Sequence, residues 1–446
     1  MRLLSKGGFA SAEEYAVYSK IAARLLPYLL LLYIVAFLDR INVSFAKLSM
    51  AADIGLSDTA YGLGAGIFFI AFCIFEIPSN LLLQRFGARF WIARIMVTWG
   101  LICAAMAWIS TPMHFYILRF MLGFAEAGFY PGIILYLTYW FPSRLRGQAT
   151  AVFVVGIALA GVIGAPACGW IMSHMQTFSL FRDWQWLFLL TGMPAILLGV
   201  STYFYLQDSP QDAHWLNDAE KRFVTEDLAR DPANHREHHR LSDAFSNLWV
   251  WVLALINFTI VISLYGVSFW LPQIVKNLGV DNTFYNGLLV AIPSLLAAIT
   301  MVLVARHSDR TLERRWHVVG CAIVATIGLL LAAIYPGQAY VSLFGLSLAM
   351  MGVLSGFSML WTVPPLLLSG TAIAAGIALI TTVGNFGGYA GPYLVGYVKQ
   401  VTGHLEYALY CLAALSLLGA IATALLPVLR QPETASREWV TAPSRQ

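Results

Sequence analysis

Long apolar stretches fill most of this chain of 446 residues and limit its possible folds more than any other feature. Twelve of them have about 20 residues or more, the length at which an α-helix crosses the hydrocarbon core of a bilayer. They lie near residues 22–46, 58–83, 90–110, 114–139, 148–173, 186–206, 248–275, 285–305, 317–335, 339–363, 371–398 and 405–428. The sequence therefore predicts an all-α integral membrane protein with 12 transmembrane helices.

The composition excludes a soluble globular protein. Only 11% of the residues are charged and the mean hydropathy is +0.71, so lipid must solvate much of the apolar surface. The net charge of +4 comes from short basic clusters between apolar stretches, which favours a membrane protein over a nucleic-acid binder. No nucleophile elbow, paired-histidine zinc helix or phosphate loop occurs, and the five cysteines lack metal-ligand spacing. We expect neither an enzyme nor a metal or cofactor site.

The spans form two groups of six around one long polar stretch. We expect an N-terminal half at residues 1–206, a connector at 207–247, and a C-terminal half with a short tail at 248–446. A capping-box pattern within the connector predicts a short helix near residues 217–229.

Two landmarks indicate that the halves repeat each other. The polar loop after the second span aligns with the loop after the eighth, with an offset of 225 between Gln84 and Asp309. The fifth and eleventh spans carry Pro166 and Pro392, which differ by 226. Duplicated halves place a substrate site near the bilayer midplane where they meet, and the halves can rock around it.

The distribution of basic residues predicts the orientation. Of the 27 Lys and Arg residues, 21 fall on the side that holds both termini and the connector, four fall on the other side, and two lie within spans. Because cytoplasmic loops carry the excess of Lys and Arg, we expect both termini and the connector to be cytoplasmic in a multi-pass cell-membrane protein.

Five ionisable residues lie inside the predicted spans, all in the N-terminal half: Asp39, Arg40, Glu76, Arg119 and Glu126. Each costs at least ~2.5 to 3.5 kcal/mol at a helix centre, so such residues usually mark an ion or substrate pathway. The alternative is that they form ion pairs that only hold helices together. Glu76, near the predicted cytoplasmic end of its span, suits a gate or helix-end role as well as proton transfer.

Spacing suggests how these groups share a site. Arg119 and Glu126 are seven residues apart, so they lie on one helix face with a rise of ~10 Å and can line one cavity. Asp39 and Arg40 are about 100° apart around their helix, so one can face the cavity while the other reaches the fourth span. Arginine offers a carboxylate a planar fork and keeps its proton, whereas a buried carboxyl can exchange one. We therefore predict a seat for an anion and one for a proton.

The cavity candidates in the second half are neutral. Adding the offset of 226 to Asp39 gives Tyr265 in the seventh span, and Trp361 and Asn385 lie in the tenth and eleventh. Each can bind the ring, hydroxyls or second carboxylate of a substrate. The two aromatic residues can equally be packing, whereas an unpaired amide within a span is costly and favours function for Asn385.

The duplicated loop resembles a known motif. Its second copy, with Asp309-Arg310 and Arg314-Arg315, is similar to the conserved cytoplasmic motif of the major facilitator superfamily. The resemblance covers essentially the whole chain and implies the fold of that superfamily, with two pseudo-symmetric six-helix halves. The gating candidates are Glu76 and the loop residues Arg85, Gly87, Arg89, Asp309, Arg310 and Arg314.

Two further segments are similar to the anion:cation symporter branch of this superfamily. They are Phe37-Leu-Asp39-Arg40-Ile-Asn42 and the stretch from Arg119 through Glu126 to Gly132. That branch includes proton-coupled permeases for tartrate, phthalate, hydroxyphenylacetate and sugar acids, mostly in bacterial inner membranes. The resemblance implies that Asp39 and Glu126 carry protons, that Arg40 binds the substrate carboxylate with help from Arg119, and that Trp361 and Asn385 contact substrate.

The sequence departs from this pattern at three positions. The first loop copy has Asn80 where the superfamily usually has Gly and Gln84 where it has Asp, so the gating charges rest mainly on the second copy. Phe72 precedes Glu76 by four residues, where galactonate-type permeases carry a tyrosine. The substrate can therefore be either a hydroxy acid other than galactonate or an aromatic acid.

The sequence thus predicts a proton-driven importer of a small organic anion that works by alternating access. We expect a monomer in lipid with no cofactor, and sodium is the alternative coupling ion. A proton-coupled exporter of organic anions or drugs shares the same architecture. A membrane sensor that binds the anion without transporting it is the third possibility, although no signalling domain is evident.

Overall fold

The computed structural model describes residues 11–178, 180–231, 247–367 and 372–426. The described residues form helices and no strands, which confirms the predicted all-α class. The helices of the first group are α1 (Ala12–Asp53), α2 (Asp58–Phe86), α3 (Ala88–Ala105), α4 (Pro112–Glu126), α5 (Phe129–Thr138), α6 (Ser143–Val154), α7 (Gly156–His174) and α8 (Asp183–Tyr205). After α9 (Asp218–Ala229), the second group comprises α11 (Leu248–Ser268), α12 (Leu271–Asn277), α13 (Thr283–Thr311), α14 (Arg315–Ile334), α15 (Ala339–Leu360), α16 (Pro364–Leu367), α17 (Ala372–Thr402) and α18 (Glu406–Ala424).

Eleven helical segments among the described residues are long and apolar enough to cross a membrane. The eleventh predicted span corresponds to α17, which is not one of these segments but has 31 residues. At 1.5 Å per residue, a helix of this length exceeds the thickness of the hydrocarbon core.

The fourth and fifth predicted spans are each built from two helices in sequence. Between α4 and α5, Gly128 adopts φ of +86°, a conformation that few residues other than glycine reach without strain. A Cβ at this position would also lie closer than 3.0 Å to the Ser79 side chain of α2. The break turns α5 relative to α4 directly after Glu126.

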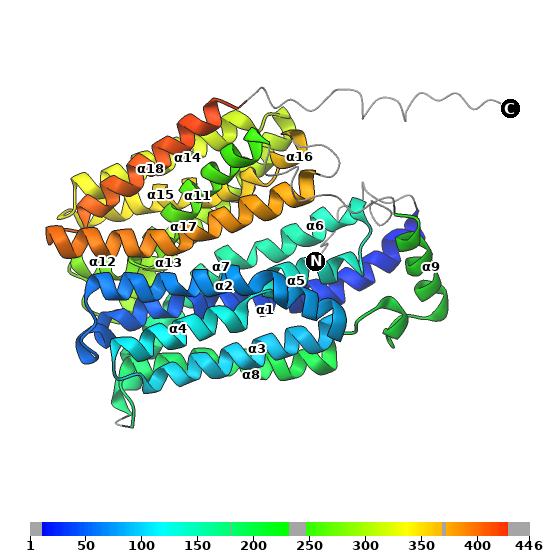
Figure 1. Ribbon diagram of the computed structural model, residues 1–446, viewed down its shortest axis with the longest axis horizontal. Coiled ribbons are helices and arrows are strands. Elements are labelled where there is room, and N and C mark those ends of the chain that lie inside the picture. Colours follow the sequence, from blue (N-terminus) through cyan, green and yellow to red (C-terminus); the bar gives the residue numbers. More distant parts are fainter. Residues whose placement is uncertain (1–10, 179, 232–246, 368–371, 427–446) are drawn as a thin grey trace.

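The two helix groups lie side by side, with α1 to α8 in blue to green on one side and α11 to α18 in green to red on the other (Figure 1). Helix α9 lies at one end of the bundle, which we call the connector end. It forms where the capping box predicts it, because Asn217 and Glu220 satisfy each other's backbone N–H groups. Its contacts with α1 include Lys20 to Glu220 at 2.7 Å and Tyr18 to Asp227 at 2.6 Å. The connector residues 232–246 and the tail from 427 lie outside the described residues.

The helix groups meet most extensively away from the connector end, where α2 packs on α17, α7 on α13 and α1 on α12. Small residues make these contacts close. A Cβ on Gly62 or Gly66 of α2 would lie closer than 3.0 Å to the backbone oxygen of Pro392 or Tyr389, respectively. Gly169 of α7 meets α13 in the same way. We call this set of contacts the far interface.

An ion cluster reinforces the far interface. Asp58 of α2 lies 2.8 Å from the Lys47 ammonium of α1 and 3.0 Å from the Lys399 ammonium of α17. Lys47 also lies 3.7 Å from the ring centroid of Trp270, a cation–π contact between the two helix groups. We refer to these four residues as the Asp58 cluster. Its charges join the groups at the end opposite the connector.

Candidate functional site

The largest of the described cavities lies between the two helix groups and has a volume of about 340 Å³. Its lining comes from α1, α2, α4 to α7, α11, α15 and α17, together with Trp361. The lining residues are Tyr33, Phe37, Arg40, Phe69, Phe72, Glu76, Glu126, Phe129, Tyr130, Ile134, Thr150, Ile157, Asn257, Val261, Leu264, Tyr265, Phe357, Trp361, Ile377, Thr381 and Asn385. This volume suits a small organic molecule. We call it the central cavity.

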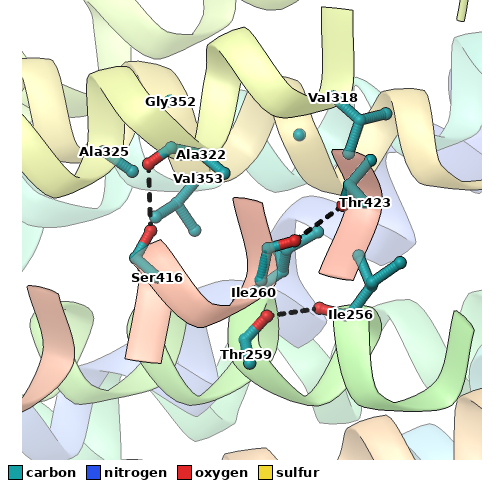
Figure 2. A pocket seen from close by; sticks show the side chains of 12 residues that line it. Ile256, Thr259, Ile260, Val318, Ala322, Ala325, Gly352, Val353, Ser416 and Thr423 are labelled. Atoms are coloured by element: carbon teal, nitrogen blue, oxygen red, sulfur yellow. Dashed lines mark hydrogen bonds between the residues drawn. The ribbon is translucent and has the colours of Figure 1, made fainter. Parts of the chain in front are cut away.

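Two smaller cavities are poor substrate sites. One has about 10 Å³ within the second helix group, and Figure 2 shows its hydroxyl groups already bonded to backbone oxygens, such as Ser416 to Ala322 and Thr259 to Ile256. That space is near the minimum for one water molecule. The other, of about 40 Å³, lies between the groups beside residues such as Ser268 and Ser294.

Arg40 is the charged centre of the central cavity. Its Nη2 donates to Oε1 of Glu126 on α4, and its Nη1 donates to the Tyr265 hydroxyl of α11 at 3.1 Å. The guanidinium therefore connects the two helix groups through the cavity. Arg40 is the only Lys or Arg among the described lining residues, and its Nε has no hydrogen-bond partner there. One cation with unused donor capacity is suited to holding a second carboxylate.

Asp39 lies on the other side of α1, buried among α1, α3 and α8. Its Oδ1 accepts from Asn42 at 2.9 Å, and the Asn42 amide also donates to Thr191 at 2.8 Å. Its Oδ2 has no hydrogen-bond partner among the described residues. The angle of about 100° between neighbouring helix positions thus separates Asp39 from Arg40. Asp39 does not line the central cavity.

The expectation that Arg119 shares a cavity with Glu126 is wrong. It is fully buried against α2, where its Nη2 donates to the Ala65 carbonyl at 3.1 Å and its guanidinium lies 5.0 Å from the Phe68 ring centroid. Arg119 lies two helical turns farther from the connector end than Glu126. Between them, Gly123 lets α2 pack closely on α4. Packing by α2 therefore covers Arg119 and leaves Glu126 in the cavity.

The second helix group contributes the neutral residues that the sequence singles out. Tyr265, Trp361 and Asn385 all line the central cavity, as does Glu76 of α2. Asn257 of α11 also lines it and is not among the residues predicted from the sequence. The sequence does carry a signal for it, because a lone amide in an apolar span is as costly at Asn257 as at Asn385.

The first loop copy is held by the connector. Gly87 adopts φ of +86°, and a Cβ there would lie 2.9 Å from an oxygen of Asp208. Asp208 accepts from the backbone N–H of Arg89 at 2.8 Å, which caps the start of α3. Arg89 also donates to the Tyr203 carbonyl, whereas Arg85 is exposed. A connector carboxylate thus occupies this loop, where Gln84 provides none.

The second loop copy carries its own ion pair. Asp309 lies 2.7 Å from Arg314, whose Nη1 donates to Ser308 at 2.9 Å. Arg310 is exposed. Leu312, which aligns with Gly87 at the offset of 225, adopts φ of +54° and is the one described residue other than glycine with positive φ. This leucine holds a left-handed conformation that is strained for a residue with a Cβ.

We expect Leu312→Gly to stabilise the protein by about 0.5 to 1 kcal/mol. The reason is that relief of ~1 to 2 kcal/mol of left-handed strain exceeds the ~0.4 to 1 kcal/mol by which glycine favours the unfolded chain. The melting temperature of the purified protein measures the effect. Leu312→Ala is the matched control, since it shortens the side chain but keeps the Cβ, and an equal gain there would argue against strain.

The chemistry of the site is therefore ionic and hydrogen-bonding. Among the described residues, no group of three or more His, Cys, Asp or Glu side chains is placed to hold a metal ion. What the central cavity offers is a paired arginine and carboxylate, two amides and a wall rich in aromatic rings.

Comparisons with known proteins agree with this architecture. The profile of the Major Facilitator Superfamily matches residues 29–392. A protein of Agrobacterium vitis provisionally named a tartrate transporter is 44% identical over 414 residues, which cover 93% of this chain and 95% of that protein. The inner membrane transport protein RhmT of Escherichia coli (strain K12) is 39% identical, covering 91% of this chain and 94% of that one. The quinolone resistance transporter of Acinetobacter baumannii is 39% identical, covering 92% and 94%.

Solved structures extend the likeness to the fold. A crystal structure of a bacterial homologue of the human lysosomal transporter Spinster, in an inward-facing and occupied conformation, superimposes with a TM-score of 0.75 at 15% identity, covering 90% of this chain and 96% of that one. The sequence profile, the full-length relatives and the fold agree, and the chain belongs to the major facilitator superfamily, whose members here are membrane transporters rather than enzymes.

Proposed function

We propose that this protein is a proton-coupled importer of a small organic anion that works by alternating access. The observation that carries the proposal is the Arg40–Glu126 pair in the central cavity. A guanidinium that is already bonded to a carboxylate is a site at which a substrate carboxylate and a proton can compete.

The direction of access follows from the distribution of charge. Most of the described Lys and Arg residues lie toward the connector end, and by the positive-inside rule we assign that end, and with it both termini, to the cytoplasm. The far interface then lies on the outer side and is closed. With the far interface closed, we interpret the arrangement as an inward-facing state. We propose that the protein acts as a single chain in the bacterial inner membrane.

Coupling arises from the choice of partner for Arg40. When Glu126 is protonated it is neutral, and the Arg40 guanidinium is released to bind the anion. When Glu126 loses its proton inside the cell, it regains Arg40 and expels the anion. Asp39 neighbours Arg40 in sequence and has an unpartnered carboxylate oxygen among the described residues, so we assign it as a second proton site. Arg119 supports α2 near this pair rather than contacting the anion.

Uptake into proteoliposomes tests the proposal. Purified protein is reconstituted, a pH gradient that is acidic outside is imposed, and the accumulation of a labelled organic anion is followed. We expect accumulation that stops when a protonophore collapses the gradient. Accumulation that follows a sodium gradient and ignores pH would assign the coupling ion to sodium instead.

Glu126→Gln separates coupling from binding. Glutamine mimics the protonated carboxyl, so we expect the variant to bind the anion and exchange it across the membrane but to lose accumulation driven by the pH gradient. Counterflow and gradient-driven uptake measure the two activities. Glu220→Gln, which removes a carboxylate from the connector surface, is the control and should accumulate normally. Normal accumulation by Glu126→Gln would remove Glu126 from the proton pathway.

Export is the second candidate, favoured by the similarity to the quinolone resistance transporter. The same pair can serve an exporter in which an outgoing substrate exchanges for an incoming proton. Whole cells distinguish the two directions, because an importer raises the internal concentration of the labelled anion in energised cells and an exporter lowers it.

A further inference from the structure

We propose that the central cavity selects an aromatic carboxylate whose ring carries a hydrogen-bond donor, such as a hydroxyl group, over an aliphatic hydroxy acid or sugar acid. This inference rests on the proposed function only in taking Arg40 as the seat of the carboxylate. It concerns the part of the ligand beyond that carboxylate, and two separate features of the cavity support it.

The first feature is the surroundings of the guanidinium. The Arg40 Cζ lies between 5.2 and 5.9 Å from the ring centroids of four phenylalanines on α1 and α2: Phe37, Phe68, Phe69 and Phe72. Three of these rings also line the cavity. Apart from Tyr265 and Glu126, which already bond the guanidinium, a group attached to a carboxylate held by Arg40 therefore meets phenylalanine rings, which offer no hydrogen bond.

These rings discriminate between classes of anion. In tartrate or a sugar acid, the carbon next to the carboxylate carries a hydroxyl group. A hydroxyl that faces the phenylalanine rings rather than Tyr265 loses its water without gaining a partner, which lowers affinity by about tenfold for each such group. An aromatic ring in the same place stacks on its neighbours or meets them edge to face, and each such contact is favourable.

The wall continues this character in the second helix group. Phe357 and Trp361 both line the cavity, with ring centroids 6.1 Å apart and planes inclined by 87°. Tyr265 packs on Phe69 across the helix groups, at a centroid distance of 4.4 Å. Rings from both groups thus surround the cavity, so a flat aromatic ligand can contact both at once.

The second feature is Asn257. It is 2% exposed and lines the cavity, and its Nδ2 donates to the Ile380 carbonyl of α17 at 3.0 Å. Gly384 makes room for this amide, because a Cβ there would lie closer than 3.0 Å to Nδ2. The hydrogen bond fixes which amide atom is the nitrogen, so the atom left without a partner among the described residues is the acceptor Oδ1.

A buried acceptor without a donor is costly, and a ligand that supplies the donor recovers that cost. Thr381, a lining hydroxyl on α17, already donates to the Ile377 carbonyl at 2.8 Å. Asn257 is therefore a buried lining group whose acceptor oxygen lacks a hydrogen-bond donor among the described residues. A ligand that combines a carboxylate, an aromatic ring and a hydrogen-bond donor therefore matches Arg40, the aromatic wall and Asn257.

Binding to the unmodified protein tests the proposal. Purified full-length protein in nanodiscs is titrated with benzoate, the three monohydroxybenzoate isomers, cyclohexanecarboxylate and tartrate, and binding is followed by calorimetry. We expect at least one hydroxybenzoate isomer to bind about tenfold more tightly than benzoate, and benzoate to bind more tightly than tartrate. Tartrate binding as tightly as the best isomer, or no isomer exceeding benzoate, would overturn the proposal, as would the failure of every aromatic acid to bind.

Asn257→Ala identifies the acceptor. The variant should lose the preference for hydroxybenzoate over benzoate while keeping its affinity for benzoate, whereas a variant that has merely lost structure loses both. Asn286→Ala is the matched control, because Asn286 is equally buried, donates to the Pro272 carbonyl at 2.9 Å and also has an unpartnered Oδ1, but does not line the cavity. An unchanged preference in Asn257→Ala would overturn this assignment.

Transport of the same ligands separates this inference from the proposed function. If tartrate binds best and is accumulated under a pH gradient, the importer stands and the aromatic specificity fails. If a hydroxybenzoate binds best but is never moved by a pH gradient, the specificity stands and the proton-coupled function fails.

Discussion

Arg40→Gln is expected to abolish uptake and to weaken anion binding by about a hundredfold or more. The substitution removes the only cation among the described cavity-lining residues and leaves Glu126 buried without its partner. Removing one member of a buried, hydrogen-bonded charge pair costs about 2 to 5 kcal/mol, and part of that penalty is the stranded charge. Titration calorimetry and proteoliposome uptake measure the two losses.

Three companion variants define the cause. Arg40→Lys keeps the charge but not the planar fork, so we expect an intermediate loss of affinity. The double variant Arg40→Gln, Glu126→Gln leaves no unpaired charge, so it should melt at a higher temperature than Arg40→Gln while still failing to transport. Arg94→Gln changes an arginine on α3 that stacks on Trp91 outside the cavity, and it should transport normally. Wild-type affinity in Arg40→Gln would refute the assignment of the anion seat.

Adding two methyl groups at the far interface is expected to arrest transport with the site open to the outside. In the double variant Gly62→Ala, Gly66→Ala, each new Cβ would lie closer than 3.0 Å to a backbone oxygen of α17. Such a clash with backbone cannot be relieved by a change of side-chain rotamer. Overpacking typically costs about 1 to 3 kcal/mol at each position, and every 1.4 kcal/mol shifts a two-state equilibrium about tenfold. The closed far interface then becomes the minor state.

Cysteine labelling reports this shift. The reporter is Ser268→Cys in a background without the five natural cysteines. Residue 268 lines the cavity of about 40 Å³ beside the far interface, and that cavity is too small to admit a maleimide. We expect rapid labelling by an impermeant maleimide only when both glycines are replaced. The control, Gly147→Ala, Gly320→Ala, adds methyl groups to helical positions with no atom nearby, and it should leave labelling and uptake unchanged. Slow labelling in the Gly62, Gly66 variant would contradict the model of closure.

The sequence was sufficient for much of the architecture and for part of the site. Long apolar stretches define helices because backbone groups in lipid must pair locally, so the spans and the capped connector helix were predictable. The cost of charge in a bilayer singled out Arg40 and Glu126, and the repeat offset led from Asp39 to Tyr265, all without coordinates. Arg40, Glu126 and Tyr265 do meet, through hydrogen bonds of the guanidinium.

The remainder depended on how helices pack against each other. Helix periodicity places Arg119 and Glu126 on one face, but it does not say how far along that face a neighbouring helix covers it. Gly123 lets α2 approach α4 and buries Arg119, an effect of a partner distant in sequence. The break at Gly128 was not predicted, because glycine is frequent in membrane helices, and both its positive φ and the close approach of Ser79 are known only from the fold.

The Asp58 cluster has two ammonium groups for one carboxylate, and its net charge is divided unequally: Lys47 and Asp58 belong to the first helix group and Lys399 alone to the second. In the proposed cycle, Asp58 leaves with Lys47 when the far interface separates, whereas Lys399 departs on α17 without a counterion from the cluster. Opening therefore exposes an ammonium group without a partner from the cluster to the outer vestibule. A positive charge of this kind raises the local concentration of an approaching anion. The movement that opens the far interface would then also attract the substrate from a dilute medium.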